Sequence, residues 1–279
     1  MKNIIYTIIL LSIVSCNGQK KTETNSSNQK VNNQRTEEAK IEESDKNGDI
    51  NLSVNYKFTY NETLKIPEET IKDLPPSIKT EFLKMLKEEI HYTLIINDFE
   101  SKYEIVKNDK LTKSINEKDL DNNKSSNTTL NLPQEEIYKN QKDNLYIRKR
   151  DFFKEIYLIS DKLEIYNWEI KNDKMKIGEF NCKKAILKTK EGIVTAWFTD
   201  EIPISEGPSM YYGLPGMILK LDASDRNYDL VKIEKIDKKI EIKKPKDGKV
   251  ISKNEFQKLV DKNKNKTKIE ESVEEHIEE

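Results

Sequence analysis

Alternation of apolar and polar side chains with a period of two residues is the feature that most constrains this fold. Between positions 54 and 60, every even position is aromatic or aliphatic and every odd position is polar. Successive side chains of a strand point to opposite faces of a sheet, so this pattern predicts a half-buried strand. Further short strands are predicted at 92–97, 102–106, 145–149, 153–159, 168–170, 183–189, 193–199, 217–222 and 228–236. The polar stretch 116–131 predicts an exposed hairpin.

Two segments predict helices instead. One begins at Ser77 as its N-cap and has an apolar face made of Ile78, Phe82, Met85, Leu86 and Ile90. The other begins with a capping box of Ser252 and Glu255, ahead of Phe256, Leu259 and Val260. We therefore expect a mainly β (α+β) fold. It is a meandering antiparallel sheet, curved or partly closed like half a barrel, with an inserted amphipathic helix and a short C-terminal helix.

The N-terminus has the pattern of an export signal. After Met1-Lys2-Asn3, the apolar run 4–14 is too short for a membrane span of about 20 residues. It ends in Ile13-Val14-Ser15-Cys16, which resembles the lipobox of bacterial lipoproteins. That resemblance implies removal of residues 1–15 and lipidation of Cys16, which anchors the chain to a membrane. The alternative is an ordinary cleaved signal followed by an incidental cysteine.

A polar tether follows the cysteine. Residues 17–50 contain few aliphatic side chains, so they cannot offset the entropy of ordering. The tether helps to explain why only 35% of the chain is hydrophobic, against a usual 45 to 50% or so. The predicted division is a signal peptide (1–15), a lipidated cysteine with a disordered tether (16–50), a β-rich domain (51–244) and a charged tail with a short helix (245–279).

Charge and rare residue types exclude several functional classes. The chain has 49 Lys plus Arg against 50 Asp plus Glu, so no bulk positive field supports nucleic-acid binding. The only two histidines, His91 and His276, poorly supply imidazole metal sites or Ser-His and Cys-His catalysis. With Cys16 lipidated, Cys182 has no disulfide partner in the chain, and a buried structural thiol is expected there. We expect no cofactor and no metal ion.

Glycine and proline are scarce but concentrate in one segment. Five of the eight glycines and three of the eight prolines lie between positions 178 and 216. Residues 213–218 read Gly-Leu-Pro-Gly-Met-Ile, which closely resembles the GLPGLI family of Bacteroidota envelope proteins, with Met217 in place of Leu. Similar pieces at 56–60, 101–103, Trp168 with 176–178, 182–185 and 196–199 extend the resemblance over roughly 52–240. The family has no established activity, so the resemblance implies only a secreted or lipid-anchored envelope protein.

Two interpretations of this motif remain open. In the structural one, Pro215 presets a turn, Gly216 takes a positive φ and Leu214 plugs the open end of a curved sheet. In the other, aromatic residues beside a rigid loop recognise a ligand by stacking on a sugar or clasping an apolar chain. The candidate residues are the same in both: Trp197, Phe198, Pro208, Tyr211, Tyr212, Gly213, Leu214, Pro215 and Gly216.

Catalytic patterns are weak. Ser205 and Ser209 have neither a neighbouring base nor a Gly-x-Ser-x-Gly elbow. Carboxylates that can pair for glycoside hydrolysis are Glu201, Glu206 and Asp222, but acids are so abundant that such pairs arise by chance. A calcium loop built on Asp222, Asp225 and Asp229 lacks the required glycine and terminal glutamate.

These observations lead us to expect a non-catalytic protein anchored by lipid to the outer membrane. The periplasmic side is favoured, because residues 17–21 lack the acidic cluster associated with surface export. We expect it to bind a small or extended ligand, or to serve an outer-membrane protein partner such as a nutrient-uptake system. The alternatives are a hydrolase of glycans or peptides, which needs two gathered acids or a serine near His91, and a lipid or lipoprotein carrier, which needs a continuous apolar concavity.

Overall fold

The computed structural model describes residues 55–72, 76–106, 112–119, 124–131, 135–152, 155–238 and 240–263. Cys16, the predicted signal peptide, the tether and residues 264–279 lie outside these ranges. The described chain forms a twelve-stranded sheet, a separate two-stranded sheet, the short 3-10 helix η1 (Glu68–Thr70), helix α1 (Pro76–Met85) and a helix at 253–263. None of the helices in these ranges has the length and apolar character needed to span a membrane.

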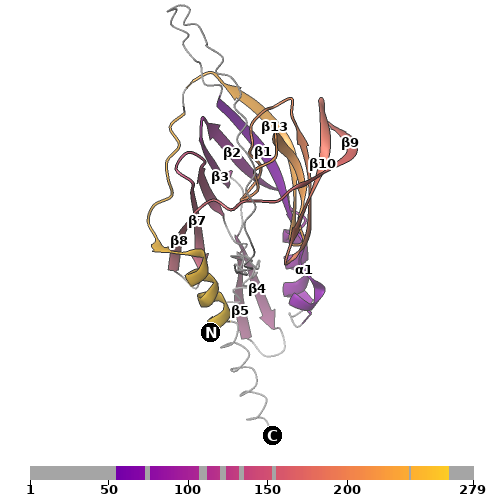
Figure 1. Cartoon of the computed structure of the whole chain (residues 1–279). Helices are drawn as coiled ribbons and strands as arrows, with labels where there is room; N and C mark the ends of the chain where they lie inside the picture. The colour runs from indigo at the N-terminus through magenta and orange to yellow at the C-terminus, as the bar shows by residue number, and fades with distance from the viewer. Residues whose placement is uncertain are drawn as a thin grey trace, which may run out of the picture.

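The large sheet is a curved meander with β1 (Asn55–Leu64) near its middle (Figure 1). On one side of β1 follow β2 (Ile90–Asn97), β3 (Glu100–Ile105), β6 (Glu136–Asn140), β7 (Leu145–Phe152), β8 (Glu155–Asp161) and β14 (Lys249–Ile251). On the other side follow β13 (Arg226–Ile236), β12 (Met217–Asp222), β11 (Gly192–Thr199), β10 (Phe180–Thr189) and β9 (Glu169–Ile177). Among the described strands, only β14 and β8 pair in parallel. The sheet ends at β14 and β9 without closing, which confirms the expected mainly β, open and curved architecture.

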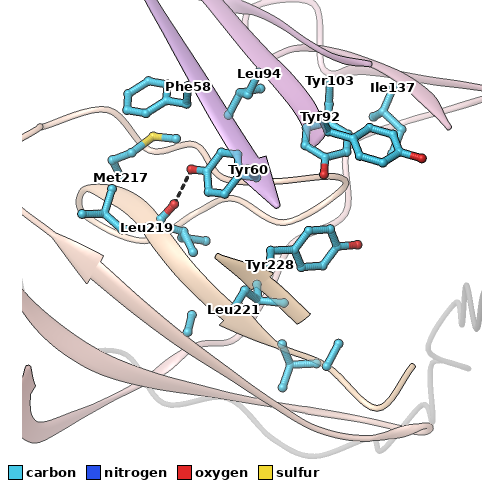
Figure 2. Close-up of a cluster of buried hydrophobic side chains, with 14 of the residues drawn as sticks. Phe58, Tyr60, Tyr92, Leu94, Tyr103, Ile137, Met217, Leu219, Leu221 and Tyr228 are labelled. Atoms are coloured by element: carbon cyan, nitrogen blue, oxygen red, sulfur yellow. Dashed lines mark hydrogen bonds between the residues drawn. The ribbon is translucent and has the colours of Figure 1, made fainter. Parts of the chain in front are cut away.

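Large aromatic side chains fill the inner face of the sheet. Tyr60 on β1 lies opposite Tyr92 on β2. Both side chains point to the inner face of the sheet and are buried. The rings of Tyr92 and Tyr103 stack with centroids 4.9 Å apart, and Tyr228 meets Tyr103 edge-on at 6.3 Å. Figure 2 shows these rings facing the aliphatic side chains of β12. The core therefore lies between the central strands and the start of β12.

The segment between β1 and β2 differs from the prediction in two respects. Helix α1 begins at Pro76, so Ser77 lies inside its first turn and is not the N-cap. Proline suits the first helical position, because it has no backbone donor to leave unpaired there. The helix ends at Met85, and Ile90 begins β2 instead of extending the apolar helical face. The predicted polar hairpin is present, but it begins four residues earlier and consists of β4 (Thr112–Asp119) and β5 (Lys124–Asn131).

The capping box at the C-terminal side is also confirmed. The amide of Glu255 donates to Ser252 Oγ at 3.2 Å, and the amide of Ser252 donates to Glu255 Oε2 at 2.9 Å. The helix that follows, residues 253–263, packs Phe256 against Phe152 at 5.3 Å between ring centroids (gold, beside β8, in Figure 1). Together with β14, this helix covers the β7–β8 side of the sheet, so these residues belong to the folded unit.

Candidate functional site

Residues 200–216, here named the bridging loop, connect β11 to β12 across the inner face of the sheet. The backbone of the loop is tied to itself and to β12, since Met217 N donates to Ile202 O at 3.0 Å and Ile218 N donates to Glu206 O at 3.0 Å. Beyond these bonds, side chains from β1 and β6 on the far side of the sheet reach the loop and the first residues of β12. The loop thereby joins the two sides of the curved sheet.

A local irregularity opens the sheet where the loop enters β12. β12 pairs with β13 only from Lys220 onward, and the β1–β13 ladder has a bulge that skips Val231. Ile218 therefore has no ladder partner on β13, and its carbonyl instead accepts a hydrogen bond of 2.6 Å from the Tyr60 hydroxyl (dashed in Figure 2). Burial raises the pKa of Tyr60 well above its ordinary value, and the Glu206 carboxylate adds to that shift, so this hydroxyl keeps its proton.

Gly216 is required where the loop returns to the sheet. A Cβ there would lie 2.1 Å from the carbonyl oxygen of Thr199, and its φ is +155°. The motif thus brings two backbones closer than any residue with a side chain allows. Gly213 differs, because its φ is +93° but an added Cβ would meet nothing nearer than 3.9 Å.

Seven ionisable side chains form a buried charge cluster beneath the loop. They are Glu62, Glu135, Lys139, Arg148, Arg150, Glu206 and Arg226, and none is more than 6% exposed. The chain has only four arginines among 49 basic residues, and three of them lie in this cluster. Guanidinium groups suit buried ion pairs better than ammonium groups, since they are less strongly hydrated and offer more donors.

Arg226 links the two carboxylates that do not come from the loop. Its Nη1 lies 2.7 Å from Glu62 Oε1 and 3.5 Å from Glu135 Oε1. Arg148 also pairs with Glu135, whose second oxygen accepts a hydrogen bond of 3.2 Å from Ser209 Oγ. Burial raises the pKa of Glu62 above its ordinary value, although Arg226 opposes the shift. These acids are therefore occupied by partners within the protein.

Lys139 connects the cluster to the loop. The side chain of Lys139 is fully buried, and its Nζ lies 2.6 Å from Glu206 Oε2. The same ammonium donates to the carbonyls of Gly207 and Tyr211, each at 3.3 Å. Gln141 adds a bond of 3.0 Å to the other oxygen of Glu206. These polar contacts add to the apolar packing of the loop, which places Ile202 and Leu214 in the core.

Four half-buried aromatic residues form what we name the aromatic group: Tyr166, Trp168, Tyr211 and Tyr212. The ring of Tyr166 lies 6.2 Å from Trp168, 6.0 Å from Tyr211 and 5.5 Å from Tyr212, measured between centroids. Trp168 Nε1 donates to Tyr212 O at 2.9 Å, and the Tyr212 hydroxyl donates to Glu164 O. Hydrogen bonds thus hold the Trp168 and Tyr212 rings, and Tyr166 and Tyr211 pack against them, while part of each side chain remains accessible.

The nine motif residues predicted from the sequence separate into three environments. Four are buried and hold the turn in place: Phe198, Pro208, Leu214 and Gly216. Tyr211 and Tyr212 belong to the aromatic group, next to the exposed Gly213 and Pro215. Trp197 alternates with the buried Phe198 and instead lies beside Lys184, whose Nζ is 6.0 Å from its ring. The structure therefore does not bring Trp197 together with Tyr211 and Tyr212.

Several residues of the site have no local signal in the sequence. Lys139 and Glu135 come from a segment that was not predicted as a strand, and Tyr166 comes from the connection before β9. Trp168 did have a signal, since it begins the predicted strand 168–170, although β9 starts one residue later at Glu169. The rarity of arginine beside lysine is the one compositional feature that distinguishes Arg148, Arg150 and Arg226.

The carboxylates considered for hydrolysis have different partners. Glu201 accepts hydrogen bonds from Asn181, Asp222 pairs with Lys65 at 2.5 Å, and Glu206 pairs with Lys139. Glu62 and Glu135 do lie together on the inner face of the sheet, but both are buried and form ion pairs with arginine. Within the described ranges, no group of three or more His, Cys, Asp or Glu residues is arranged to hold a metal ion.

In the comparison with known proteins, one family profile matches a short stretch of the chain. A family profile described as "Protein of unknown function (Porph_ging)" matches residues 186–220, which include β11 and the whole bridging loop. No curated protein matches the chain. Two solved structures of PNGF-II, in the C2 and P21 space groups, are similar with TM-scores of 0.47 and 0.42 and identities of 16% and 18%. The matches cover 75% and 66% of this chain but only 33% and 29% of the PNGF-II chains.

Proposed function

We propose that this protein is a lipid-anchored, non-catalytic envelope protein of the GLPGLI type that binds a small or extended ligand through the aromatic group. The Cys16 motif supports the anchor, and the profile match over 186–220 agrees with a family of unknown function. The ligand would reach the protein on the periplasmic side of the outer membrane, where the protein would serve a partner such as a nutrient-uptake system.

The aromatic group is the observation that carries this proposal. Its rings are half-buried, so part of each side chain stays accessible to a ligand, and hydrogen bonds to Tyr212 O and Glu164 O hold Trp168 and Tyr212 in place. Fixed aromatic faces lose little entropy on binding, and they bind sugar rings and acyl chains alike. The bridging loop supplies two of the four rings, so the Gly213–Gly216 turn supports the site without contacting the ligand.

The charge cluster favours a binding role over a hydrolytic one. A general acid or base must reach the substrate, and a nucleophile must be activated by a free base. Glu62, Glu135 and Glu206 are buried and paired with arginine or lysine, and Ser209 donates to Glu135 from a buried position. A carrier is also disfavoured, since the bridging loop packs Leu214 and Ile202 into the core on the inner face.

Membrane anchoring is tested by fractionation. We expect Cys16→Ala to move the protein from the outer-membrane fraction to the soluble fraction, because the acyl chains provide the attachment. Cys182→Ala is the matched control and should remain with the membrane. Unchanged membrane association of Cys16→Ala would contradict the lipid anchor.

Ligand binding is tested by fluorescence of Trp168. The chain has two tryptophans, so Trp197→Phe leaves Trp168 as the reporter within the aromatic group. We expect a saturable change with a trisaccharide, either maltotriose or trigalacturonate, and its loss in Tyr212→Ala. Tyr157→Ala, which alters a tyrosine packed on Phe256, serves as the control. A response to sodium decanoate alone would assign the site to acyl chains, and no response to any probe would contradict an aromatic binding site.

A further inference from the structure

Strand β9 has one edge that pairs with no other strand in the described part of the chain. The strand pairs with β10 along its other edge and ends the sheet, at the right of Figure 1. It has nine residues and no proline, whereas β14, which ends the sheet on the opposite side, has only three residues. Short strands and prolines are among the features that keep sheet edges from pairing. β9 therefore has the length to accept a further strand.

The inner face of β9 continues the core but is only partly covered. Ile170 lies opposite Ala185 on β10, which is fully buried. Met175 lies opposite Cys182, which is buried as well. Directly opposed residues share a face of the sheet, so Ile170 and Met175 also point to the inner face. Because Ile170 is 50% exposed and Met175 is only half-buried, an added strand with apolar inner side chains would cover surface that β10 leaves open.

The outer face of the same edge is basic. Lys174 and Lys176 are exposed, and no ion pair joins either of them to another described residue. Lys174 lies directly opposite Lys183, whose own partner is Asp200 at 2.5 Å. Like charges that face each other across a sheet destabilise the pairing. An acidic side chain beside Lys174 on the open edge would offset this repulsion.

The charge of β9 also distinguishes between the strands that could join it. The strand contains three lysines against one glutamate and one aspartate, so a second copy would bring one positive edge against another. Lysines on an edge strand are a known protection against such pairing. That protection acts against like-charged strands and attracts acidic ones. The pairing of 174–177 with β10 is regular, so this part of β9 has the straight backbone that a new strand needs.

From this geometry we infer that the open edge of β9 binds an extended segment of a partner protein in which acidic and apolar residues alternate. The acidic residues would lie beside Lys174 and Lys176 on the outer face. The apolar residues would lie beside Met175 and Ile177 on the inner face. Backbone hydrogen bonds would provide affinity, and the alternation would provide specificity.

This added strand requires no rearrangement of the described structure, because the edge is already open. The inference rests on the proposed function for the existence of a protein partner, and it does not use the aromatic group. It adds the place where the partner binds and the sequence pattern of the segment that binds.

Fluorescence anisotropy with the full-length protein in detergent tests the inference. The probe is a labelled eight-residue peptide in which glutamate and valine alternate. One control peptide alternates lysine and valine, and the other has four glutamates followed by four valines. We expect the alternating acidic peptide to bind at least about tenfold more tightly than either control, because only it matches both faces of the edge.

Charge reversal on β9 tests the location. The double variant Lys174→Glu/Lys176→Glu should weaken binding of the acidic peptide by at least about tenfold. The matched control is Lys235→Glu/Lys238→Glu, which makes the same change in charge at exposed positions near the end of β13, three strands away from the edge. All four lysines are exposed, so both variants should fold.

Amide hydrogen exchange tests whether the peptide joins the sheet. The acidic peptide should slow exchange within 169–177, because an added strand pairs with the amides on the open edge. Tight binding without slower exchange in β9 would overturn the added strand. A loss of affinity in the β13 control as large as that in the β9 variant would overturn the location.

The remaining outcomes separate this inference from its alternatives. Equal binding of the alternating and the block acidic peptides would overturn it, because the pattern would then not matter. A dimer of the free protein with slow exchange in β9 would assign the edge to a second copy and overturn it as well. No peptide binding together with a saturable Trp168 response to a trisaccharide would overturn this inference and leave the aromatic site intact.

Discussion

Substitution of Gly216 tests whether the turn of the bridging loop is fixed by a close backbone approach. In Gly216→Ala, the new Cβ would lie 2.1 Å from Thr199 O and 2.7 Å from Thr199 C, whereas real Cβ contacts essentially never fall below 3.0 Å. Both neighbouring atoms belong to the backbone, so rotation of a side chain cannot relieve the clash. One of the two backbone segments, at Gly216 or at Thr199, must move by about 0.9 Å, the difference between 2.1 and 3.0 Å.

That movement has a cost that can be estimated from its parts. Overpacking costs about 1 to 3 kcal/mol, the positive φ about 1 to 2 kcal/mol, and the weakened bond between Met217 N and Ile202 O about 1 kcal/mol. We therefore expect a loss of about 3 to 6 kcal/mol, a large part of the roughly 5 to 15 kcal/mol that stabilises a domain. Gly216→Val should cost at least as much.

Urea denaturation followed by tryptophan fluorescence measures this loss. Gly178→Ala is the matched control, because Gly178 also has a positive φ, +58°, but a Cβ there would meet nothing within 4 Å. It should lose only about 1 kcal/mol, from the backbone conformation alone. If Gly216→Ala is no less stable than Gly178→Ala, the close approach to Thr199 does not govern the turn. If Gly216→Ala unfolds normally but loses ligand binding, the turn itself takes part in recognition.

Three further predictions concern other parts of the molecule. Burial raises the pKa of Cys182 to about 11, so in a Cys16→Ala background its thiol should react slowly with Ellman's reagent at neutral pH and quickly in urea; rapid reaction of the native protein would contradict its burial. Folding raises the pKa of Tyr60. The stability that its protonated hydroxyl contributes is therefore fully present below about pH 10, the ordinary tyrosine pKa, and is lost as the pH rises further. The free energy of unfolding should accordingly fall above about pH 10, and less steeply in Tyr60→Phe; equal slopes for the two proteins would show that this hydroxyl is not involved. Phe256→Ala should cost about 3 kcal/mol and raise amide exchange in 253–263 alone, since this ring fills a separate small core against Phe152; slow exchange in that helix would contradict its docking through Phe256.

Strands with one buried apolar face were predictable, because apolar and polar residues alternate along a strand that buries only one face. β1 and β11 meet this condition, because buried residues fall at every second position along most of each strand. β6 was missed because two of its buried residues, Lys139 and Asn140, are polar and break the alternation. β14 has only three residues, too few for any period to be visible. Ser77 was misplaced because proline, which also suits a first helical position, precedes it.

The site was predictable only in part. The Gly and Pro residues located the loop, since backbone geometry of this kind needs particular residue types. The charge cluster was not predictable, because its members lie between positions 62 and 226 and meet only through the order of the strands. Local sequence contains no information on which lysine or glutamate of so charged a chain turns inward. The aromatic group was not predictable for the same reason, because Tyr166 and Trp168 are far from the motif in sequence and meet it only in the fold.

The central place of β1 also determines how the molecule bears a mechanical load. The strand is flanked on both sides, by β2 and β13, and its ladder with β13 extends from Asn55 to Leu64. A pull on the chain that precedes Asn55 acts along this strand, so many hydrogen bonds on two sides must shear together before it moves. A chain held at an edge strand would instead peel away one bond at a time. A load on the predicted tether would therefore enter the sheet through a strand that is paired on both sides.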